Sequence, residues 1–237
     1  MIETSGLTKV YGDKRAVDRL TLRVEPGEVM GFLGPNGSGK TTTIRLLMGL
    51  LRPTEGSASI RGRDCHRDAV ALKREVGYLP DEPFLYPYLS GYESLELVAG
   101  LHGFPPREAR ARARASAETF GLGDAAGTFT VTYSHGMKKR LALAMALIHD
   151  PQVLILDEPT NGLDPKGARE MRDTIARLAA GGARSSCRRI CSRPRSASAT
   201  ASPSSAPASC RRWARPPSCA RATPLRPRPA SRTCSCG

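Results

Sequence analysis

The segment GPNGSGKTT, from Gly34 to Thr42, constrains the fold more than any other part of the chain. It matches the pattern G-x-x-x-x-G-K-[ST] and lies between an apolar stretch, EVMGFLG, and a stretch with helical spacing of apolar residues, GKTTTIRLLMGLL. Glycines let the backbone curl so that successive N–H groups point at phosphate oxygens, and the start of a helix adds partial positive charge. Strand, loop and helix together predict a phosphate-binding loop in an α/β fold.

The side chains of this loop suit a nucleotide. Lys40 is placed to reach the β- and γ-phosphates, and the Thr41 hydroxyl can bind Mg²⁺. A glycine-rich turn with a chance lysine is the alternative, but it would not explain the strand and the helix that flank the loop. We therefore expect nucleotide contacts from Gly34, Asn36, Gly37, Ser38, Gly39, Lys40, Thr41 and Thr42.

A second motif, VLILDEP, brings two carboxylates to the end of a buried strand. Phosphoryl transfer needs a metal to neutralise charge and a base to orient the nucleophile. Asp157 is expected to hold the magnesium ion, and Glu158 to polarise the attacking water, which makes Glu158 and Lys40 the predicted catalytic residues. A solvated strand end with two acids is the alternative, and it would not explain the phosphate-binding loop.

The remaining pattern predicts an α/β architecture. LTLRV, SASIRG and VGYLP are typical of short strands, and MKKRLALAMALIHDP is typical of an amphipathic helix before the buried strand QVLILD. Residues 86–129 have helical character with loops, and REARARARASA within them is a strong helix former, whose arginines we interpret as a solvated face. Helices that alternate with apolar strands predict a mostly parallel sheet with a helical insertion.

The segment from Tyr133 to Pro165 resembles the ATP-binding subunit of ABC transporters, of the exporter-like ABC-2 type. In that family a loop of the L-S-G-G-Q type opens a helix before the strand that carries the two carboxylates. Here YSHGM takes its place and keeps the serine, Ser134, and the second glycine, Gly136. The resemblance implies that these two residues close over the γ-phosphate held by a second subunit. A plain helix N-cap at Ser134 is the simpler interpretation.

A similar pentapeptide occurs upstream. LSGYE, from Leu89 to Glu93, looks more like the family's loop than YSHGM does. It lies too far from the strand with the two carboxylates, so we do not assign it that role.

The resemblance also implies an architecture and partners. It predicts a P-loop ABC ATPase core with an N-terminal antiparallel β part, made of residues 1–85 and 135–183, and a helical subdomain over 86–134. ATP and Mg²⁺ are the implied cofactors. The implied partners are a second ATPase subunit and a separate membrane permease, with the protein peripheral on the cytoplasmic face of the cell membrane and no nucleic acid bound.

Three further residues match family positions. Tyr11 corresponds to an aromatic residue that stacks on adenine, although a partly buried tyrosine at a strand end is an equal alternative. Asp81 stands where the family has a glutamine that senses magnesium, and a carboxylate can meet Mg²⁺ directly or through water. Asp164 is expected at the dimer contact.

The chain changes character after Ala183. Of its 36 basic residues, 12 are arginines between Arg184 and Gly237, where no acidic residue occurs, so the 24 basic and 22 acidic residues before Arg184 nearly balance. Six of the seven cysteines also lie in this tail. A nucleic-acid-binding protein and a secreted disulfide framework are therefore disfavoured, because the part that should fold has neither feature. The start of the chain has no signal-peptide pattern, and no apolar run approaches the roughly 20 residues that cross a bilayer.

We interpret Arg184 onward as an out-of-frame translation. The family continues with a strand that ends in a histidine contacting the γ-phosphate, yet no histidine follows His149. Read one base earlier, permitted codons turn RSSCRRICSR into TVLLSTHLLE, which places that histidine at Ile190. The alternative is a natural disordered basic tail. On either account we expect no stable fold from Arg184 onward, weak ATP hydrolysis and a tendency to aggregate.

A second class of function stays open at this point. Soluble ABC-type ATPases act on ribosomes or DNA, and they share the same nucleotide motifs. Such proteins usually carry tandem cassettes or a long coiled-coil insertion, whereas this chain has one set of motifs and no heptad pattern.

Overall fold

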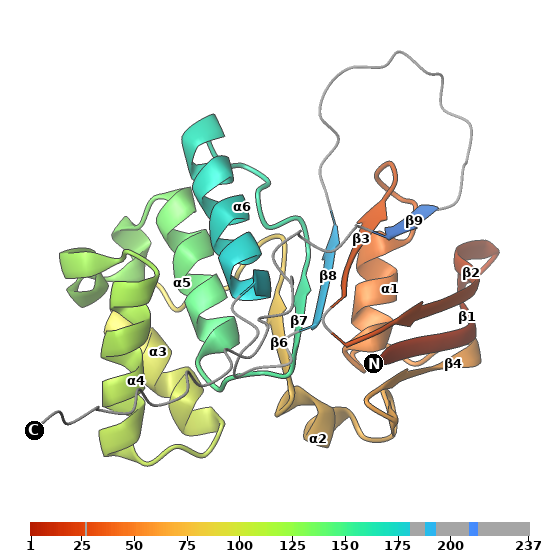
Figure 1. The fold of residues 1–237 in the computed structure, drawn as a ribbon, viewed down its shortest axis with the longest axis horizontal. Coiled ribbons are helices and arrows are strands. Elements are labelled where there is room, and N and C mark those ends of the chain that lie inside the picture. Colours follow the sequence, from red (N-terminus) through yellow and green to blue (C-terminus); the bar gives the residue numbers. More distant parts are fainter. Residues whose placement is uncertain (27, 181–187, 193–208, 213–237) are drawn as a thin grey trace, which may run out of the picture.

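Two sheets and a helical part make up the computed structural model, which describes residues 1–26, 28–180, 188–192 and 209–212 (Figure 1). The first sheet is antiparallel, with the order β2-β1-β4-β5. Its strands are β1 (Ile2–Tyr11), β2 (Lys14–Val24), β4 (Glu55–Ile60) and β5 (Arg63–Asp64). Ile2 pairs with both Val24 and Ile60, and all three side chains are buried. The predicted N-terminal antiparallel part is thus confirmed.

The second sheet has the order β6-β7-β8-β3-β9. Its strands are β3 (Val29–Leu33), β6 (Val76–Leu79), β7 (Val153–Leu156), β8 (Arg188–Ser192) and β9 (Ser209–Arg212). Every neighbouring pair is parallel except β3 and β9, which confirms the predicted mostly parallel sheet. Helix α1 (Lys40–Leu47) follows β3, and the short helix α2 (Ala69–Lys73) precedes β6.

Strand β7 is buried on both faces, as its unbroken apolar run predicts. Val153 and Ile155 pack into the core that α1 shares with the antiparallel sheet. Leu154 and Leu156 point the other way, into the core of the helical part. Because alternate side chains of β7 are buried in two different cores, the register of the strand is fixed, and with it the position of the residues that follow Leu156.

The helical part consists of α3 (Gly91–Leu101), α4 (Pro106–Thr119), α5 (His135–Leu147) and two short 3₁₀ turns, Gly123–Gly127 and Thr130–Thr132. In α4 an alanine stripe of Ala109, Ala113 and Ala117 is buried, so three of the four arginines of that helix remain exposed: Arg107, Arg110 and Arg114. The fourth, Arg112, pairs with Glu108 and Asp150 at 2.9 and 2.8 Å and joins α4 to the end of α5.

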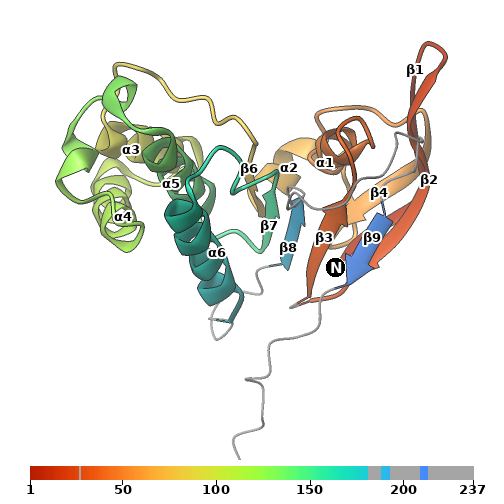
Figure 2. The same ribbon diagram turned by 90° about the horizontal axis from the view of Figure 1, so that it is seen from above.

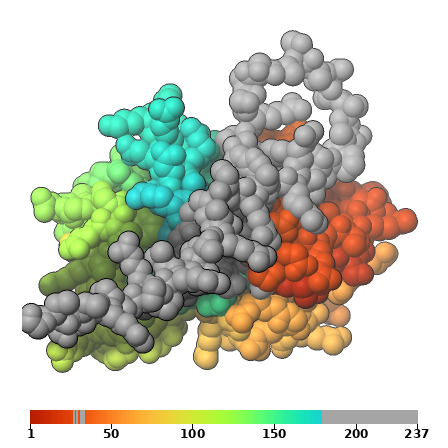
Figure 3. Space-filling view, viewed as in Figure 1, coloured from red at the N-terminus to blue at the C-terminus, as the bar shows by residue number. Residues whose placement is uncertain are grey.

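The antiparallel sheet and the helical part lie at opposite ends of the molecule (Figures 2 and 3). Helix α6 (Pro165–Ala180) runs beside α5, next to the five-stranded sheet (Figure 1). Within the described part of the chain, none of the helices combines the length and the apolar character that crossing a bilayer demands.

Two segments of the tail form strands where the sequence predicted no stable fold. β8 lies between β7 and β3 and is parallel to both, with Ile190 opposite Ile155 on one side and Met30 on the other. β9 pairs with the other edge of β3. The reason is that a strand in a ladder is held by main-chain hydrogen bonds, which depend little on side-chain type. The rest of residues 184–237 lies outside the described residues.

Candidate functional site

The phosphate-binding loop joins β3 to α1, as predicted. Gly37 and Gly39 have φ angles of 82° and 89°, a conformation that favours glycine. A Cβ atom at Gly39 would overlap the carbonyl oxygen of Ala16, so this position also has no room for a side chain. Gly39 is the N-cap of α1, with no side-chain cap and no acidic residue in the first turn. The helix start is therefore available to an anion.

Lys40 lies inside the loop and is only 6% exposed. Its Nζ donates to the carbonyl oxygens of Gly34 and Pro35 at 3.0 and 3.3 Å. The same ammonium lies 3.6 Å from Oε1 of Glu158, which comes from the other motif. The structure thus brings together the two residues that the sequence predicted to be catalytic.

The loop fits a nucleotide phosphate. The Oγ atom of Ser38 is buried and has no hydrogen-bond partner among the described residues. A buried hydroxyl in a native protein normally has a partner, so this one is suited to a ligand oxygen. Thr43 is already bound, because its hydroxyl donates to the carbonyl of Gly39 at 2.9 Å, whereas Thr41 is exposed at the start of the helix. The residues present therefore suit a phosphate chain with Mg²⁺.

The two carboxylates follow β7, as the sequence predicted. Asp157 is 2% exposed, and its backbone N–H donates to the carbonyl of Leu79 at 2.8 Å, which holds it against the end of β6. Burial, and then the charge of Asp157, raises the pKa of the neighbouring Tyr78 to about 12. Arg45 opposes this increase in the pKa, and Asp81 contributes to it. Negative charge therefore gathers where β6 and β7 end, an environment that favours a cation.

Glu158 has an uncommon backbone. Its φ is 44°, in the left-handed region that non-glycine residues seldom adopt. Its carbonyl accepts hydrogen bonds from the backbone N–H of Asn161 at 3.0 Å and from Nζ of Lys139 at 3.1 Å. Uncommon backbone conformations of this kind persist where the surroundings hold them, often at functional sites.

Asp81 lies beside this turn. Its carboxylate accepts from Nζ of Lys139 at 3.3 Å and from Nδ2 of Asn161 at 3.1 and 3.2 Å. The structure therefore places Asp81 in a hydrogen-bonded group with Lys139 and Asn161. Its contact with Mg²⁺ stays a prediction.

The sequence analysis missed Lys139, although α5 carried a signal. The side chain is fully buried, with 0% exposure. Positions one turn and two turns further along the same face are Leu143 and Ala146, which are also buried. A lysine beside so many apolar residues in one helix needs a buried partner, which is the signal that α5 carried.

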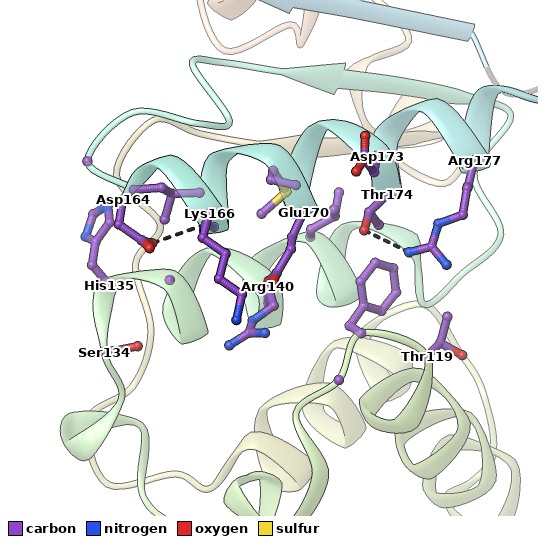
Figure 4. A pocket seen from close by; sticks show the side chains of 18 residues that line it. Thr119, Ser134, His135, Arg140, Asp164, Lys166, Glu170, Asp173, Thr174 and Arg177 are labelled. Atoms are coloured by element: carbon purple, nitrogen blue, oxygen red, sulfur yellow. Dashed lines mark hydrogen bonds between the residues drawn. The ribbon is translucent and has the colours of Figure 1, made fainter.

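Ser134 and Gly136 stand at the start of α5. Ser134 is the N-cap residue, and its Oγ accepts from the backbone N–H of Met137 at 3.2 Å, so the simpler interpretation as a helix cap is confirmed. Both residues line a groove of about 970 Å³ between α5 and α6 (Figure 4). Closing over a second subunit's nucleotide stays a prediction, which the exposure of Ser134 permits.

Asp164 and Tyr11 are placed by α6 and by β1. Asp164 lines the same groove and caps α6, because its Oδ1 accepts from the backbone N–H of Gly167 at 3.2 Å (Figure 4). Tyr11 ends β1, is 47% exposed, and has the ammonium of Lys9 5.2 Å from its ring centre. The dimer contact of Asp164 and the stacking of Tyr11 on adenine stay predictions.

Comparison with known proteins gives relatives for this site. The sequence profile of the family described as ABC transporter matches residues 17–161. The daunorubicin resistance ATP-binding protein DrrA3 of Streptomyces coeruleorubidus is 47% identical over 181 residues, which cover 76% of this chain and 57% of that protein. The bacitracin transport ATP-binding protein BcrA of Bacillus licheniformis is 42% identical over 179 residues, with 76% and 58% covered. The chain thus spans less than two thirds of the length of these relatives.

Solved structures agree with the sequence relatives. A dimeric ATP-binding cassette in a post-hydrolysis state, bound to ADP and phosphate, superposes with a TM-score of 0.72 at 25% identity, covering 81% of this chain and 88% of that one. The protein CbiO1 of Clostridium perfringens, part of an ABC transporter complex, gives 0.71 at 28% identity, with 81% and 77% covered.

Proposed function

The chain belongs to the ABC transporter family as an ATP-binding subunit, and on that premise we propose that it hydrolyses Mg-ATP to power a separate membrane permease. The contact between Lys40 and Glu158 is the observation that carries the proposal. It joins the phosphate-binding loop to the strand end with two carboxylates, although 118 positions separate the two residues in the chain. Loop and carboxylates thus form one site.

Each side chain then has a task. The loop N–H groups, the Ser38 hydroxyl and Lys40 would bind the phosphates, and Thr41, Asp157 and Asp81 would hold Mg²⁺. When bound, Mg²⁺ would neutralise charge on the transferred phosphoryl group. Glu158 orients the attacking water and accepts its proton, which a carboxylate at 18% exposure can do because bulk water competes little for it.

We propose one contact with a second ATPase subunit and another with the permease. Ser134 and Gly136 cover the γ-phosphate held by a second ATPase subunit, and the start of α5 supplies partial positive charge. The loop after β6 offers an apolar docking surface for the permease, at the cytoplasmic face of the membrane. It exposes Phe84, Tyr86 and Tyr88, and the segment hydrogen-bonded to it exposes Phe129 and Val131, each side chain more than half exposed.

The names of the relatives suggest the direction of transport. One relative is named for daunorubicin resistance and another for bacitracin transport. By analogy, this subunit would serve an exporter of antibiotic-like compounds.

Replacing Glu158 tests the proposed chemistry. Glu158→Gln keeps the shape of the side chain but cannot take the proton, so we expect hydrolysis to fall by about 10²-fold or more while binding of a fluorescent ATP analogue persists. Lys40→Ala removes the charge that meets the phosphates and should weaken that binding by about 10-fold or more. The assignment would be contradicted if Glu158→Gln hydrolysed ATP as fast as the wild type and Lys40→Ala bound the analogue as tightly as the wild type.

Position 190 tests the interpretation of the tail. We propose that Ile190 stands where the family has the histidine of the γ-phosphate, so that hydrolysis by the chain as written is slow. Ile190→His should then raise kcat by about 10-fold, because it restores a polar partner to the phosphate. Arg189→His is the matched control at the adjacent position of β8. Equal rates for the two variants would contradict the interpretation.

A further inference from the structure

The group formed by Asp81, Lys139 and Asn161 links three separate parts of the chain at one turn. Asp81 follows β6, Lys139 lies in the second turn of α5, and Asn161 lies in the loop after β7. The side chains of Lys139 and Asn161 both donate hydrogen bonds to the carboxylate of Asp81, and Lys139 also donates one to the carbonyl of Glu158.

A buried ammonium requires these contacts. Lys139 is fully buried, and an unpaired charge in a protein interior is costly. Asp81 supplies the opposite charge, and the carbonyl of Glu158 takes a second of the three ammonium protons. An amide at position 81 would leave the ammonium without a counter-ion, which gives a physical reason for an aspartate here.

The contact between Lys139 and the Glu158 carbonyl affects the candidate catalytic site. The Glu158 carbonyl accepts from Nζ of Lys139 and from the backbone N–H of Asn161, while the Asn161 side chain donates to Asp81. The group therefore holds the carbonyl of Glu158 from two sides and fixes the left-handed turn there. That turn directs the Glu158 side chain towards Lys40, 3.6 Å away.

We propose that Lys139, balanced by Asp81, is a positioning residue for the catalytic carboxylate of Glu158. This inference rests on the proposed function, because Glu158 must take part in ATP hydrolysis for its position to matter. Lys139 acts through the main chain and does not touch the nucleotide. The phosphate-binding loop keeps its own contacts when Lys139 is changed.

The inference predicts a split between binding and turnover. Lys139→Met keeps the length of the side chain and removes the charge, so kcat should fall by at least about 10-fold, while KM and the dissociation constant of a fluorescent ATP analogue stay within about twofold. Lys138→Met is the matched control, because Lys138 is the adjacent lysine of the same helix and is only half-buried. We expect its kcat to equal that of the wild type.

Combination with Glu158→Gln separates positioning from general support of the fold. If Lys139 acts through Glu158, the double variant should be no slower than Glu158→Gln alone. Additive losses would overturn the inference, as would a kcat for Lys139→Met within twofold of the control. If Lys139→Met does not fold, as judged by circular dichroism, Lys139→Leu takes its place, with the same split and the same non-additivity expected.

The two proposals fail in different ways. A wild-type chain that binds no ATP analogue would refute the proposed function. A wild-type chain that binds and hydrolyses ATP, together with a Lys139→Met variant that behaves like Lys138→Met, would refute the positioning role alone.

Discussion

Helices α3 and α5 both start with a serine N-cap, but only the first turn of α3 carries an acidic residue. At α3 the Oγ of Ser90 accepts from the Glu93 N–H at 3.2 Å, and Oε2 of Glu93 accepts from the Ser90 N–H at 2.7 Å. At α5 the Oγ of Ser134 accepts from the Met137 N–H, and the first turn has no acidic residue. The first helix start is a closed capping box, and the second has a cap without a charge.

The difference teaches how a helix start is used. Ser90 is 8% exposed, and Glu93 already places a negative charge on the first turn of α3, so a further anion would be repelled there. Ser134 is exposed, and its first turn keeps the partial positive charge of the helix. A serine at the N-cap alone therefore does not predict an anion site, and we expect the charge of the residue three positions after the serine to decide.

Placing a carboxylate on α5 should have the largest effect. Met137→Glu reproduces the capping box of α3 at α5 and brings a negative charge to the proposed position of the partner's γ-phosphate. We expect ATP-dependent dimer formation, measured by analytical ultracentrifugation in the Glu158→Gln background, to weaken by about 10-fold or more. Met137→Gln has the same length without the charge and serves as the control. Equal weakening in both variants would count against an anion site at α5.

Removing the cap of α3 should affect stability alone. Ser90→Ala deletes the side-chain acceptor for the Glu93 N–H, and we expect the free energy of unfolding in urea to fall by about 1 kcal/mol. Binding of the ATP analogue should not change. Ser134→Ala is the reciprocal variant, expected to reduce ATP-dependent dimer formation. A loss of ATP-analogue binding in Ser90→Ala would break the distinction between the two helix starts.

The smallest expected effect is the loss, at low pH, of the stability that the charge of Glu93 contributes. The hydrogen bonds from Ser90 lower the pKa of Glu93 below its usual 4.5. Because the folded pKa is the lower one, Glu93 stabilises the fold above the unfolded pKa, and this contribution disappears as the pH falls through the folded pKa. Wild type should therefore be more stable than Glu93→Gln at pH 6, with the gap narrowing below pH 4.5. A gap that is constant with pH would show that the charge of Glu93 does not matter.

Local patterns were enough to predict much of this molecule. The phosphate-binding loop and the strand with two carboxylates each combine an apolar run with a particular polar residue at its end, so both could be placed from neighbouring residues alone. The antiparallel part followed from the family resemblance, and the helical insertion followed from the helical character of residues 86–129. The helix of Arg107 and its neighbours followed from propensity, and α4 is found there.

The remaining features depend on contacts between distant residues. Asp81 and Lys139 are 58 positions apart, and Asp81 and Asn161 are 80 apart, so no local pattern joins them. The left-handed φ of Glu158 likewise follows from what surrounds its carbonyl, because glutamate has no intrinsic preference for that region. The strand at Arg188–Ser192 was missed because its composition resembles a disordered tail, whereas its place is set by the main-chain ladders of its neighbours.

The sheet order β6-β7-β8-β3-β9 has a consequence for a chain that is still being synthesised. Among the described strands, β3 pairs with β8 and β9, both of which come more than 150 residues later in the sequence. On the ribosome, β3, the strand before the phosphate-binding loop, therefore waits for residues near 190 before the ladder to β7 can close. β8 thus joins β3 to β7, the strands that precede the phosphate-binding loop and the two carboxylates, and a nascent chain that ends before Arg188 lacks this connection.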